Sequence, residues 1–563
     1  MIIYNYFRFF NKQLNIKDYL LILINYFLIS LITILDILFI ALVFLLLNIN
    51  YNFGNSFFIN NINNALNNIS LKFQLSFIQS EVLILLLTLF IKNFFLIFQN
   101  FFYFNFIFKL VRKKSAEVFR NYLNLDYKSF IKKNNSYYVK NVSREVDNVF
   151  LGIFSSLIVI VGDIFYILFI ILFSFSLISV PFYSIHLLLL TLMLLVLSYL
   201  WRKLSYWGKI RSEAEESLYS NITDSFKSFK EIKIYNKDNI FVKMFDNFSK
   251  KYYKSKIING VVSVSPKIII ELGVFTFFFI SFFQSNQSIN EYIPSIAVLA
   301  LAAIRVLPQI SKISSSLGII FFYNQSFDMI ERNYLSKNHF SKQRKLRVVT
   351  VNKILLKNIS LNFIKDGKVQ RIFHKLNILF EKGKIYGVCG SSGVGKSTLL
   401  SIISGLLKPD KGSVYFNNQK INVHNVHKIF SIGSVLQNPT MFDESMMFNI
   451  TLDFNYQEDD IKNVKFLLNK FNLHKFTKQN FLLKKIESSD NKISGGEKQR
   501  LSFIRSIYQN PSVLILDEPT SALDKKNEKI LFEFLKNECK DKIIIITSHN
   551  KKHFKYFDKV INL

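Results

Sequence analysis

The stretch "GSSGVGKS" occupies residues 390–397 and decides how the C-terminal part of the chain folds. An apolar run, "KIYGVC", precedes it, and a run with helical periodicity, "TLLSIISGLL", follows it. A strand, a glycine-rich loop and a helix in this order form the context in which such a loop binds phosphate groups. The sequence therefore predicts a nucleotide-binding α/β domain around this loop.

The residue types of the loop fit phosphate chemistry. Glycines let backbone N–H groups turn toward phosphate oxygens, Lys396 brings a positive charge to the β and γ phosphates, and the Ser397 hydroxyl can bind Mg²⁺. We expect ATP and Mg²⁺ as ligands. The residues expected to contact the nucleotide here are Gly390, Ser391, Ser392, Gly393, Val394, Gly395, Lys396, Ser397 and Thr398.

A second motif, "SVLILDEP" at residues 512–519, is an apolar strand that ends in two carboxylates. Asp517 is expected to hold the magnesium ion, and Glu518 is expected to polarise the attacking water as a general base. The two motifs together predict an ATPase.

Four further motifs complete a pattern: "GSVLQNP" at 433–439, "ISGGEKQR" at 493–500, "SALD" at 521–524 and "IIIITSH" at 543–549. With the phosphate loop, this set resembles an ATP-binding cassette domain. The resemblance implies a signature loop, a metal-binding and catalytic glutamine, a nucleotide-contacting aspartate, a catalytic switch histidine and an aromatic that stacks on adenine. The matching residues are Ser494, Gly495, Gly496, Gln437, Asp524, His549 and Phe363.

Two departures from the family pattern stand out. Glu497 occupies the position where glutamine is more usual, and residues 480–492, "NFLLKKIESSDNK", are short and lack the glycine-containing stretch commonly found there. The second departure puts in doubt how the cassette is coupled to the rest of the chain.

The N-terminal part has a membrane composition. Half of the 563 residues are hydrophobic and the formal net charge is +32. About 20 apolar residues span a bilayer, and six runs pass this test: 19–49, 81–111, 149–176, 181–204, 257–284 and 291–323. The first is too long for a signal-peptide core. Because loops 109–144 and 202–256 are rich in Lys and Arg, we expect them and both termini in the cytoplasm.

Six spans followed by one cassette resemble a half-size type I exporter of the ATP-binding cassette family. We expect a helical transmembrane domain at 1–330, a linker at 331–349 and the α/β cassette at 350–563. The resemblance implies an ATPase coupled to transport. It also implies a homodimer, since the family's sites pair the phosphate loop of one chain with the signature loop of the other. A bacterial inner membrane is expected from the resemblance to bacterial flippases that is described below.

Three loops carry further predictions. Residues 57–73 have Phe58, Ile62, Leu66 and Ile69 at helical spacing, which fits either an amphipathic helix on the outer surface or an ordinary polar loop. "LDYKSFIKKNN" at 125–135 and "SFKSFKEIKIYNK" at 225–237 are candidate coupling helices, or plain basic loops at the membrane surface. The two cysteines, Cys389 and Cys539, are predicted to be reduced buried thiols.

Charged residues inside the spans mark a transport pathway or pair with one another. The cations are Lys92, Lys267 and Arg305, and the acids are Asp36, Asp163 and Glu271. Cations at several depths suit an anionic substrate, and we assign the three of them to its path. The structural alternative is ion pairing between side chains, for example of Lys267 with Glu271 one helical turn away.

The patterns "SPKIIIELG" at 265–273 and "RVLP" at 305–308, with the outer-surface helix, resemble those of bacterial flippases for polyprenyl-pyrophosphate-linked oligosaccharides. This implies an amphipathic, anionic, lipid-linked substrate in contact with the bilayer. Open alternatives are export of drugs or other lipids, export of peptides, and a cassette that gates rather than pumps. Since Asn, Lys, Ile and Phe are abundant along the whole chain, we attribute part of the positive charge to compositional drift and expect no nucleic-acid partner.

Overall fold

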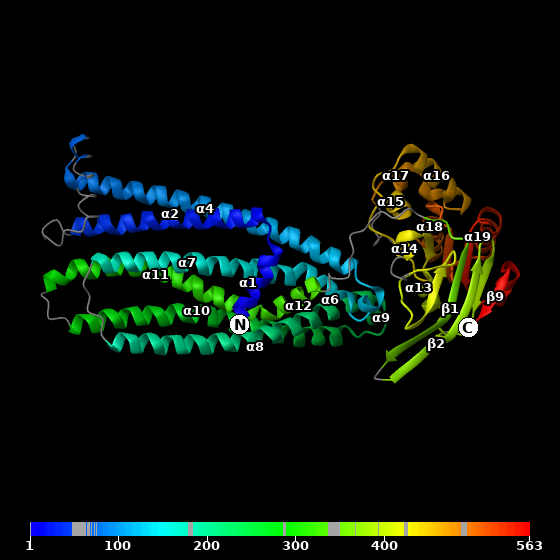
Figure 1. The fold of residues 1–563 in the computed structure, drawn as a ribbon, viewed down its shortest axis with the longest axis horizontal. Coiled ribbons are helices and arrows are strands. Elements are labelled where there is room, and N and C mark those ends of the chain that lie inside the picture. The colour runs from blue at the N-terminus through cyan, green and yellow to red at the C-terminus, as the bar shows by residue number, and fades with distance from the viewer. Residues whose placement is uncertain are drawn as a thin grey trace. The chain divides into compact units, whose positions relative to one another are not determined.

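The computed structural model describes residues 2–47, 64, 68, 70–72, 74, 76–177, 184–284, 289–335, 349–365, 368–391, 393–421, 426–485 and 493–563. The chain forms two compact units. The first unit consists of Met1–Asn124 and Lys133–Phe340, and the second consists of Leu125–Lys132 and Ser341–Leu563. The first is helical and the second contains the sheets (Figure 1).

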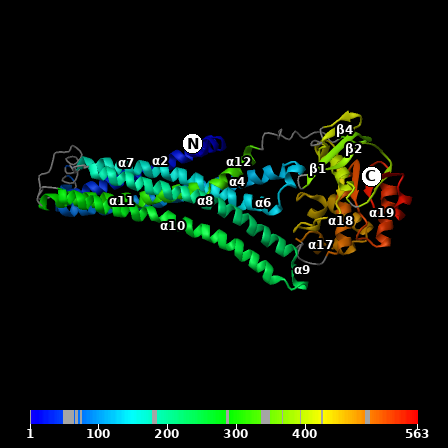
Figure 2. The same cartoon turned by 90° about the horizontal axis from the view of Figure 1, so that it is seen from below.

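Within the described residues, six helices of 23 residues or more run side by side in the first unit (Figures 1 and 2). They are α2 (Ile16–Leu47), α4 (Phe77–Leu123), α7 (Ser155–Leu177), α8 (Ser184–Lys227), α10 (Asp238–Gln284) and α11 (Ile289–Phe322). The predicted membrane domain of six long helices is confirmed. Shorter helices are α1 (Ile2–Gln13), α6 (Asn135–Lys140), α9 (Phe229–Ile234) and α12 (Asn324–Leu335), and two π-helical segments, η1 (Asn141–Glu145) and η2 (Asn148–Phe154), lead into α7.

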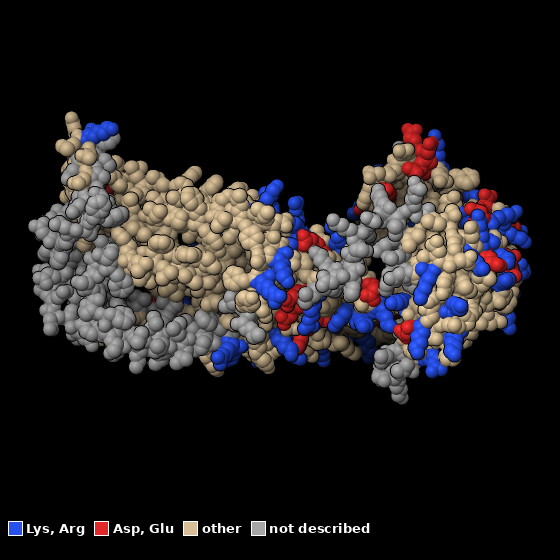
Figure 3. Space-filling model, viewed as in Figure 1, with Lys and Arg blue, Asp and Glu red and all other residues tan. Residues whose placement is uncertain are grey.

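Apolar side chains cover much of the surface of this unit. In the described part of the chain, three helical stretches are long and apolar enough to cross a membrane: Ile16–Leu46, Phe77–Leu123 and Asn135–Phe173. Figure 3 shows a broad surface without charges over α2 and α4, and Lys, Arg, Asp and Glu gather toward one end of the helices. This distribution fits helices that are surrounded by lipid along most of their length.

Aromatic residues hold α1 and α12 against the bundle. The ring centroids of Tyr6 and Phe327 lie 4.5 Å apart, and those of Phe10 and Phe150 lie 5.7 Å apart, both in edge-to-face geometry. Such pairs add to the free energy gained from burying the rings. Helices α8 and α11 also approach closely, because a Cβ atom on Gly208 would lie 2.1 Å from the backbone oxygen of Phe322.

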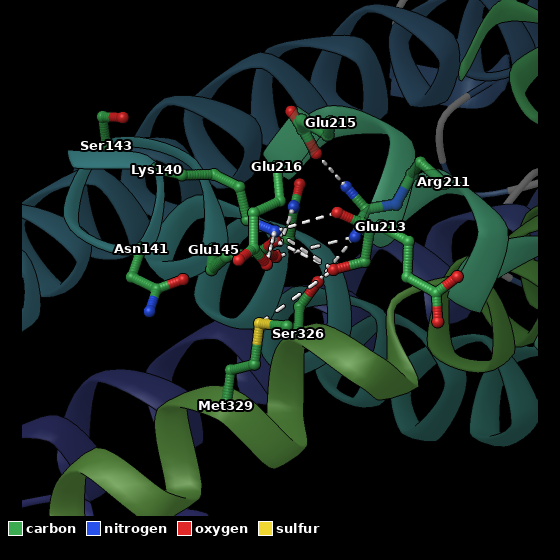
Figure 4. Close-up of polar contacts among 12 residues, drawn as sticks. Lys140, Asn141, Ser143, Glu145, Arg211, Glu213, Glu215, Glu216, Ser326 and Met329 are labelled. Atoms are coloured by element: carbon green, nitrogen blue, oxygen red, sulfur yellow. Dashed lines mark hydrogen bonds and ion pairs between the residues drawn. The ribbon is translucent and has the colours of Figure 1, made fainter. Parts of the chain in front are cut away.

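A buried group of charged residues, which we call the balanced network, joins α6, η1, α8 and α12 (Figure 4). Lys140 Nζ lies 3.2 Å from Glu145 Oε1, and Arg211 bridges Glu145 (3.5 Å) and Glu215 (2.5 Å). Arg211 Nη2 also donates to Ser326 Oγ at 2.9 Å. Among residues that are each at least 93% buried, two cations and two carboxylates therefore compensate one another, and the more exposed Glu216 lies 3.9 Å from Lys140 Nζ at the edge of this network.

The loop predictions have mixed outcomes. Short helices α5 (Tyr127–Phe130) and α9 lie within the two candidate coupling segments. Helix α12 continues to Leu335 and overlaps the start of the predicted linker, because Ile330 and Tyr334 pack in the core of the helical unit. Residues 336–348 and the four apolar residues of the predicted outer helix lie outside the described residues.

The second unit contains two sheets. The antiparallel sheet has the order β2 (Lys368–Glu381), β1 (Lys353–Lys365), β4 (Lys411–Phe416), β5 (Gln419–Lys420). The parallel sheet has the order β6 (Ile432–Val435), β7 (Val513–Asp517), β8 (Ile543–Thr547), β3 (Ile385–Cys389), β9 (Lys559–Asn562). Because the parallel strands point the same way, the segments that follow them meet at one edge of the sheet.

Strands β3 and β8 are buried along their whole length, as their continuous apolar sequences require in a sheet covered on both faces. The helices of this unit are α13 (Lys396–Ile403), α14 (Val426–Ile429), α15 (Met446–Thr451), α16 (Glu458–Lys470), α17 (Gln479–Leu482), α18 (Gly495–Tyr508) and α19 (Lys525–Glu538). Both cysteines are free and buried, and burial raises the pKa of the Cys539 thiol to about 11.

Candidate nucleotide site and membrane charge cluster

The phosphate loop connects β3 to α13, as the sequence predicts. Gly390, Gly393 and Gly395 have φ angles of +150°, +82° and +111°, which residues other than glycine rarely adopt. A Cβ atom on Gly395 would also lie 2.7 Å from Ile372 Cγ2. Glycine is therefore favoured at all three positions by the backbone conformation, and at Gly395 also by the lack of space for a Cβ atom. Ser392 lies outside the described residues.

Lys396, the first residue of α13, folds its side chain back over this loop. Its Nζ donates to the backbone oxygens of Gly390 at 2.9 Å and Ser391 at 3.1 Å. The ammonium is therefore placed beside the backbone N–H groups at the start of a helix, which is where an anion is favoured.

The carboxyl ends of β7 and β8 place Asp517 beside Ser397. Ser397 Oγ donates to Asp517 Oδ2 at 2.9 Å, and Thr547 Oγ1 donates to Asp517 Oδ1 at 2.7 Å. Thr547 also accepts a hydrogen bond from the backbone N–H of Glu518 at 2.9 Å. Sequence reasoning missed Thr547, although it lies in the same "IIIITSH" motif that identified His549.

Glu518 is held by two of the other predicted catalytic residues. Gln437 Nε2 donates to Glu518 Oε2 at 3.0 Å, and His549 Nε2 lies 2.7 Å from Glu518 Oε1. The same histidine nitrogen lies 3.0 Å from Lys396 Nζ. Glu518 has a φ angle of +48°, a sparsely populated conformation for a residue with a side chain, and such strain is concentrated at functional sites. The structure thus brings the predicted base, glutamine, histidine and lysine together.

The signature loop opens α18. Ser494 is the N-cap residue and forms a reciprocal capping box with Glu497, whose carboxylate also lies 2.7 Å from Lys475 Nζ. Partial burial raises the pKa of Glu497, but the bonds from Lys475 and the Ser494 backbone outweigh it and hold that pKa below its usual range. A Cβ atom on Gly496 would lie 2.7 Å from the backbone oxygen of Ala522. The capping box and the ion pair with Lys475 therefore give the Glu497 carboxylate hydrogen-bonding partners at the position where glutamine is more usual.

Gln499, a second residue that the sequence reasoning did not single out, ties this helix to the end of β7. Its amide nitrogen donates to the backbone oxygen of Glu518 at 2.8 Å, and its oxygen accepts from the Ala522 N–H at 3.0 Å. The sequence feature that could have identified Gln499 is its place in the motif "SGGEKQR".

The two remaining predicted nucleotide contacts lie at the start of α19 and in β1. Asp524 caps α19 by accepting from the Asn527 N–H at 2.7 Å. The backbone of Phe363 lies in β1 opposite Gln370.

The residues present fit a nucleotide with magnesium. Within the described part of the chain, no group of three or more His, Cys, Asp or Glu side chains could hold a metal ion alone. Magnesium is typically held by one or two protein groups together with substrate phosphates, and the adjacent Ser397 and Asp517 suit that arrangement.

Comparison with known proteins agrees with this geometry. Residues 373–521 match the family description "ABC transporter", and residues 38–308 match "ABC transporter transmembrane region". A lipoprotein-releasing system ATP-binding protein, LolD, of Buchnera aphidicola is 32% identical over 214 residues, which are 36% of this chain and 91% of that protein. The chain belongs to the ABC transporter family. Its ATPase activity is accordingly coupled to transport, as predicted.

Two further similarities concern the exporter architecture. Multidrug resistance protein 1 of Plasmodium falciparum is 27% identical over 311 residues, 46% of this chain but only 21% of that protein. The structure of a bacterial Atm1-family ABC exporter with ATP bound has a TM-score of 0.77 at 16% identity, and the match covers 97% of this chain and 93% of that one. This likeness shows that the ABC transporter has the type I exporter fold.

Two of the three cations assigned to the substrate path of this transporter converge on one carboxylate. Lys92 Nζ in α4 lies 2.7 Å from Asp36 Oδ1 in α2, and Arg305 Nε in α11 lies 3.4 Å from the same oxygen. Tyr166 in α7 donates its hydroxyl to Asp36 Oδ2 at 2.7 Å. We call these four residues the membrane cluster. In the described residues, neither cation has another carboxylate within 4.0 Å, so the membrane cluster carries one positive charge in excess.

The third cation lies apart from this cluster. Lys267 follows Pro266 in α10, and its side chain is exposed in the single chain. Among the described residues, it makes no ion pair with Glu271 within 4.0 Å, so the pairing considered from sequence does not form.

Proposed function

We infer that this transporter moves an amphipathic anionic lipid across the bilayer, specifically a polyprenyl-pyrophosphate-linked oligosaccharide. The observation that carries the inference is the unbalanced membrane cluster, in which Lys92 and Arg305 share Asp36. An uncompensated cation inside a span costs at least about 2.5–3.5 kcal/mol. A bound anion offsets this cost, and a pyrophosphate offers several charged oxygens to an ammonium and a guanidinium group.

The remaining parts of such a substrate match the helical unit. A polyprenyl tail is soluble in lipid, and it suits the exposed apolar face of α4, which includes Phe90, Phe94 and Phe101. The glycan travels in water, and the charged headgroup between them requires polar contacts. The likeness of "SPKIIIELG" and "RVLP" to lipid-linked oligosaccharide flippases supports the same substrate.

The energy comes from ATP in a homodimer that works by alternating access. Lys396 and the phosphate loop bind the phosphates, and Ser494 of each copy faces the γ-phosphate held by the other. Glu518 accepts the proton of the attacking water, while its contacts with Gln437 and His549 orient it. A magnesium ion, held by Ser397, Asp517 and Gln437, would neutralise charge on the phosphates. Both termini lie on the cytoplasmic side of a bacterial inner membrane.

The deciding experiment uses liposomes that contain the purified protein and a polyprenyl-pyrophosphate oligosaccharide. Movement of the glycan between leaflets is followed by its accessibility to an added lectin, with and without ATP. We expect ATP-dependent movement in the wild type, loss in Glu518→Gln through loss of hydrolysis, and loss in Arg305→Ala with hydrolysis retained. Lys209→Ala, at an exposed site, is the matched control. A wild type that hydrolyses ATP without moving the glycan would refute the assignment.

Export of drugs or other lipids is a second candidate, and one observation favours it. Helix α4 exposes a row of phenylalanines that would suit uncharged hydrophobic substrates: Phe90, Phe94, Phe98, Phe101, Phe104 and Phe108. The similarity to multidrug resistance protein 1 points the same way. Under this function Arg305→Ala would leave transport of hydrophobic dyes unchanged, which dye efflux from the same liposomes measures.

A further inference from the structure

Asp36 is the most buried charged group of the membrane cluster. Its side chain is 1% exposed, whereas Lys92 is 11% and Arg305 is 24% exposed. The two cations bind the same oxygen, Oδ1, and Tyr166 binds the other, Oδ2. The carboxylate is therefore bound on one side by a neutral hydroxyl and on the other by two cations, both of which are more exposed than Asp36 is.

The four residues come from four helices, and both cations have long, flexible side chains. Arg305 also stacks over the Phe39 ring, with the guanidinium carbon 4.8 Å from the ring centroid. Phe39 lies one turn after Asp36 in α2, so the guanidinium already spans from the carboxylate to a second support.

We propose that Asp36 is a place-holder for the substrate anion and thereby sets the charge that a headgroup needs for transport. This rests on the proposed function. In the resting site Asp36 Oδ1 is the anionic partner of both cations, and in the loaded site the phosphate oxygens of the headgroup take over that role. Lys92 and Arg305 exchange the carboxylate for the headgroup, and Tyr166 continues to hold Asp36 Oδ2. No bond is made or broken in this exchange.

The exchange makes the site selective by charge. Lys92 and Arg305 repel each other, and Asp36 offsets this repulsion in the resting site. A headgroup must therefore interact with both cations more strongly than Asp36 does if it is to replace the carboxylate. A pyrophosphate has enough charged oxygens to engage an ammonium and a guanidinium together. A single phosphate offers less charge for the same exchange, so the wild-type site discriminates against it.

Two variants separate this role from a purely structural one because they act in opposite directions. Asp36→Asn removes the competing anion, so it should lower the concentration of polyprenyl monophosphate that half-stimulates ATP hydrolysis by about 10-fold, and bring it close to the pyrophosphate value. Tyr166→Phe removes the hydroxyl that stabilises Asp36 once the cations have left, so it should raise the half-stimulating concentration of the pyrophosphate lipid. Loss of structural support alone would worsen the response in both variants.

The measurement is lipid-stimulated ATP hydrolysis in nanodiscs with polyprenyl pyrophosphate, polyprenyl monophosphate and polyprenol. Glu81→Gln is the matched control, since Glu81 is a fully buried carboxylate in α4 that belongs to no described ion pair. It should leave the monophosphate-to-pyrophosphate ratio unchanged. An unchanged ratio in Asp36→Asn, or an equal change in Glu81→Gln, overturns the role of Asp36 and leaves the proposed function standing. A wild type that responds to neither charged lipid overturns the proposed function and this role with it.

Discussion

The balanced network and the membrane cluster are both groups of buried charges that join several helices, but their charges add up differently. In the balanced network, Lys140 and Arg211 face Glu145 and Glu215, and Arg211 reaches three partners (Figure 4). In the membrane cluster, two cations share one carboxylate. The buried members of the first group are balanced in charge, whereas the second group has one positive charge in excess.

From this difference we infer that the balanced network serves the fold, and our proposal is that the membrane cluster serves transport. Removing one member of a buried ion pair leaves an uncompensated buried charge. A substitution in a charge-balanced network should therefore cost much of the protein's stability. A cluster with an excess charge retains a matched pair when one cation is removed. We therefore expect the balanced network to control stability and the membrane cluster to control substrate.

The largest expected effect comes from a residue outside both clusters, whose substitution should change ATP hydrolysis and leave stability unchanged. Glu518→Gln removes the predicted base and should lower ATP hydrolysis about 10²–10⁴-fold, measured as phosphate release in nanodiscs. Its thermal unfolding should match the wild type, because Glu518 contacts neither cluster. Glu533→Gln, at an exposed position in α19, is the control and should retain activity. A drop of less than about tenfold would assign the proton transfer to another group.

Breaking the balanced network should have the next largest effect. Arg211→Met leaves Glu145 and Glu215 without their shared partner and should destabilise the protein by about 3–5 kcal/mol. Lys209→Met, two residues earlier, removes an exposed pair 3.9 Å apart and should cost less than about 1 kcal/mol. Detergent-solubilised variants are compared by thermal unfolding. Equal losses would show that the network contributes no more than surface charges do.

Breaking the membrane cluster should cost less stability than breaking the balanced network. Arg305→Met leaves Lys92 paired with Asp36, so we expect a loss below about 2 kcal/mol, less than that of a broken buried pair. Asp36→Met, which leaves two cations without a carboxylate, should be distinctly worse in the same unfolding assay. If Arg305→Met unfolds as readily as Arg211→Met, the two clusters have the same role.

The smallest expected effect on stability comes from the partly exposed pair of Glu497 and Lys475. Glu497 has a folded-state pKa below its usual range, so its pairing with Lys475 stabilises the protein above the unfolded pKa of about 4.3 and is lost as pH falls through the folded value. Glu497→Gln should cost less than about 1 kcal/mol at pH 7 and weaken the loss of stability on acidification. Unfolding is measured at pH 7 and at about pH 4, where an unchanged acid sensitivity would contradict the assignment.

Much of the nucleotide site was predictable because its residues lie in short contiguous motifs. The loop "GSSGVGKS" contains its own glycines, lysine and serine, and apolar strands place Asp517, Glu518 and His549 at the same sheet edge. Parallel strands have this consequence wherever they occur. Gln499 and Thr547 were missed although they lie in recognised motifs, because their role is to bond backbone groups of segments elsewhere in the fold.

The sequence alone determined the presence of six long apolar helices, a phosphate loop and charges inside the spans, since hydropathy and motif spacing are local properties. Only the tertiary structure decided which of those charges meet. Asp36 lies 56 residues from Lys92 and 130 from Tyr166, and Lys267 does not pair with the glutamate one turn away. Burial makes an unpaired charge expensive, so partners are chosen by helix packing in three dimensions, and sequence spacing carries no record of that choice.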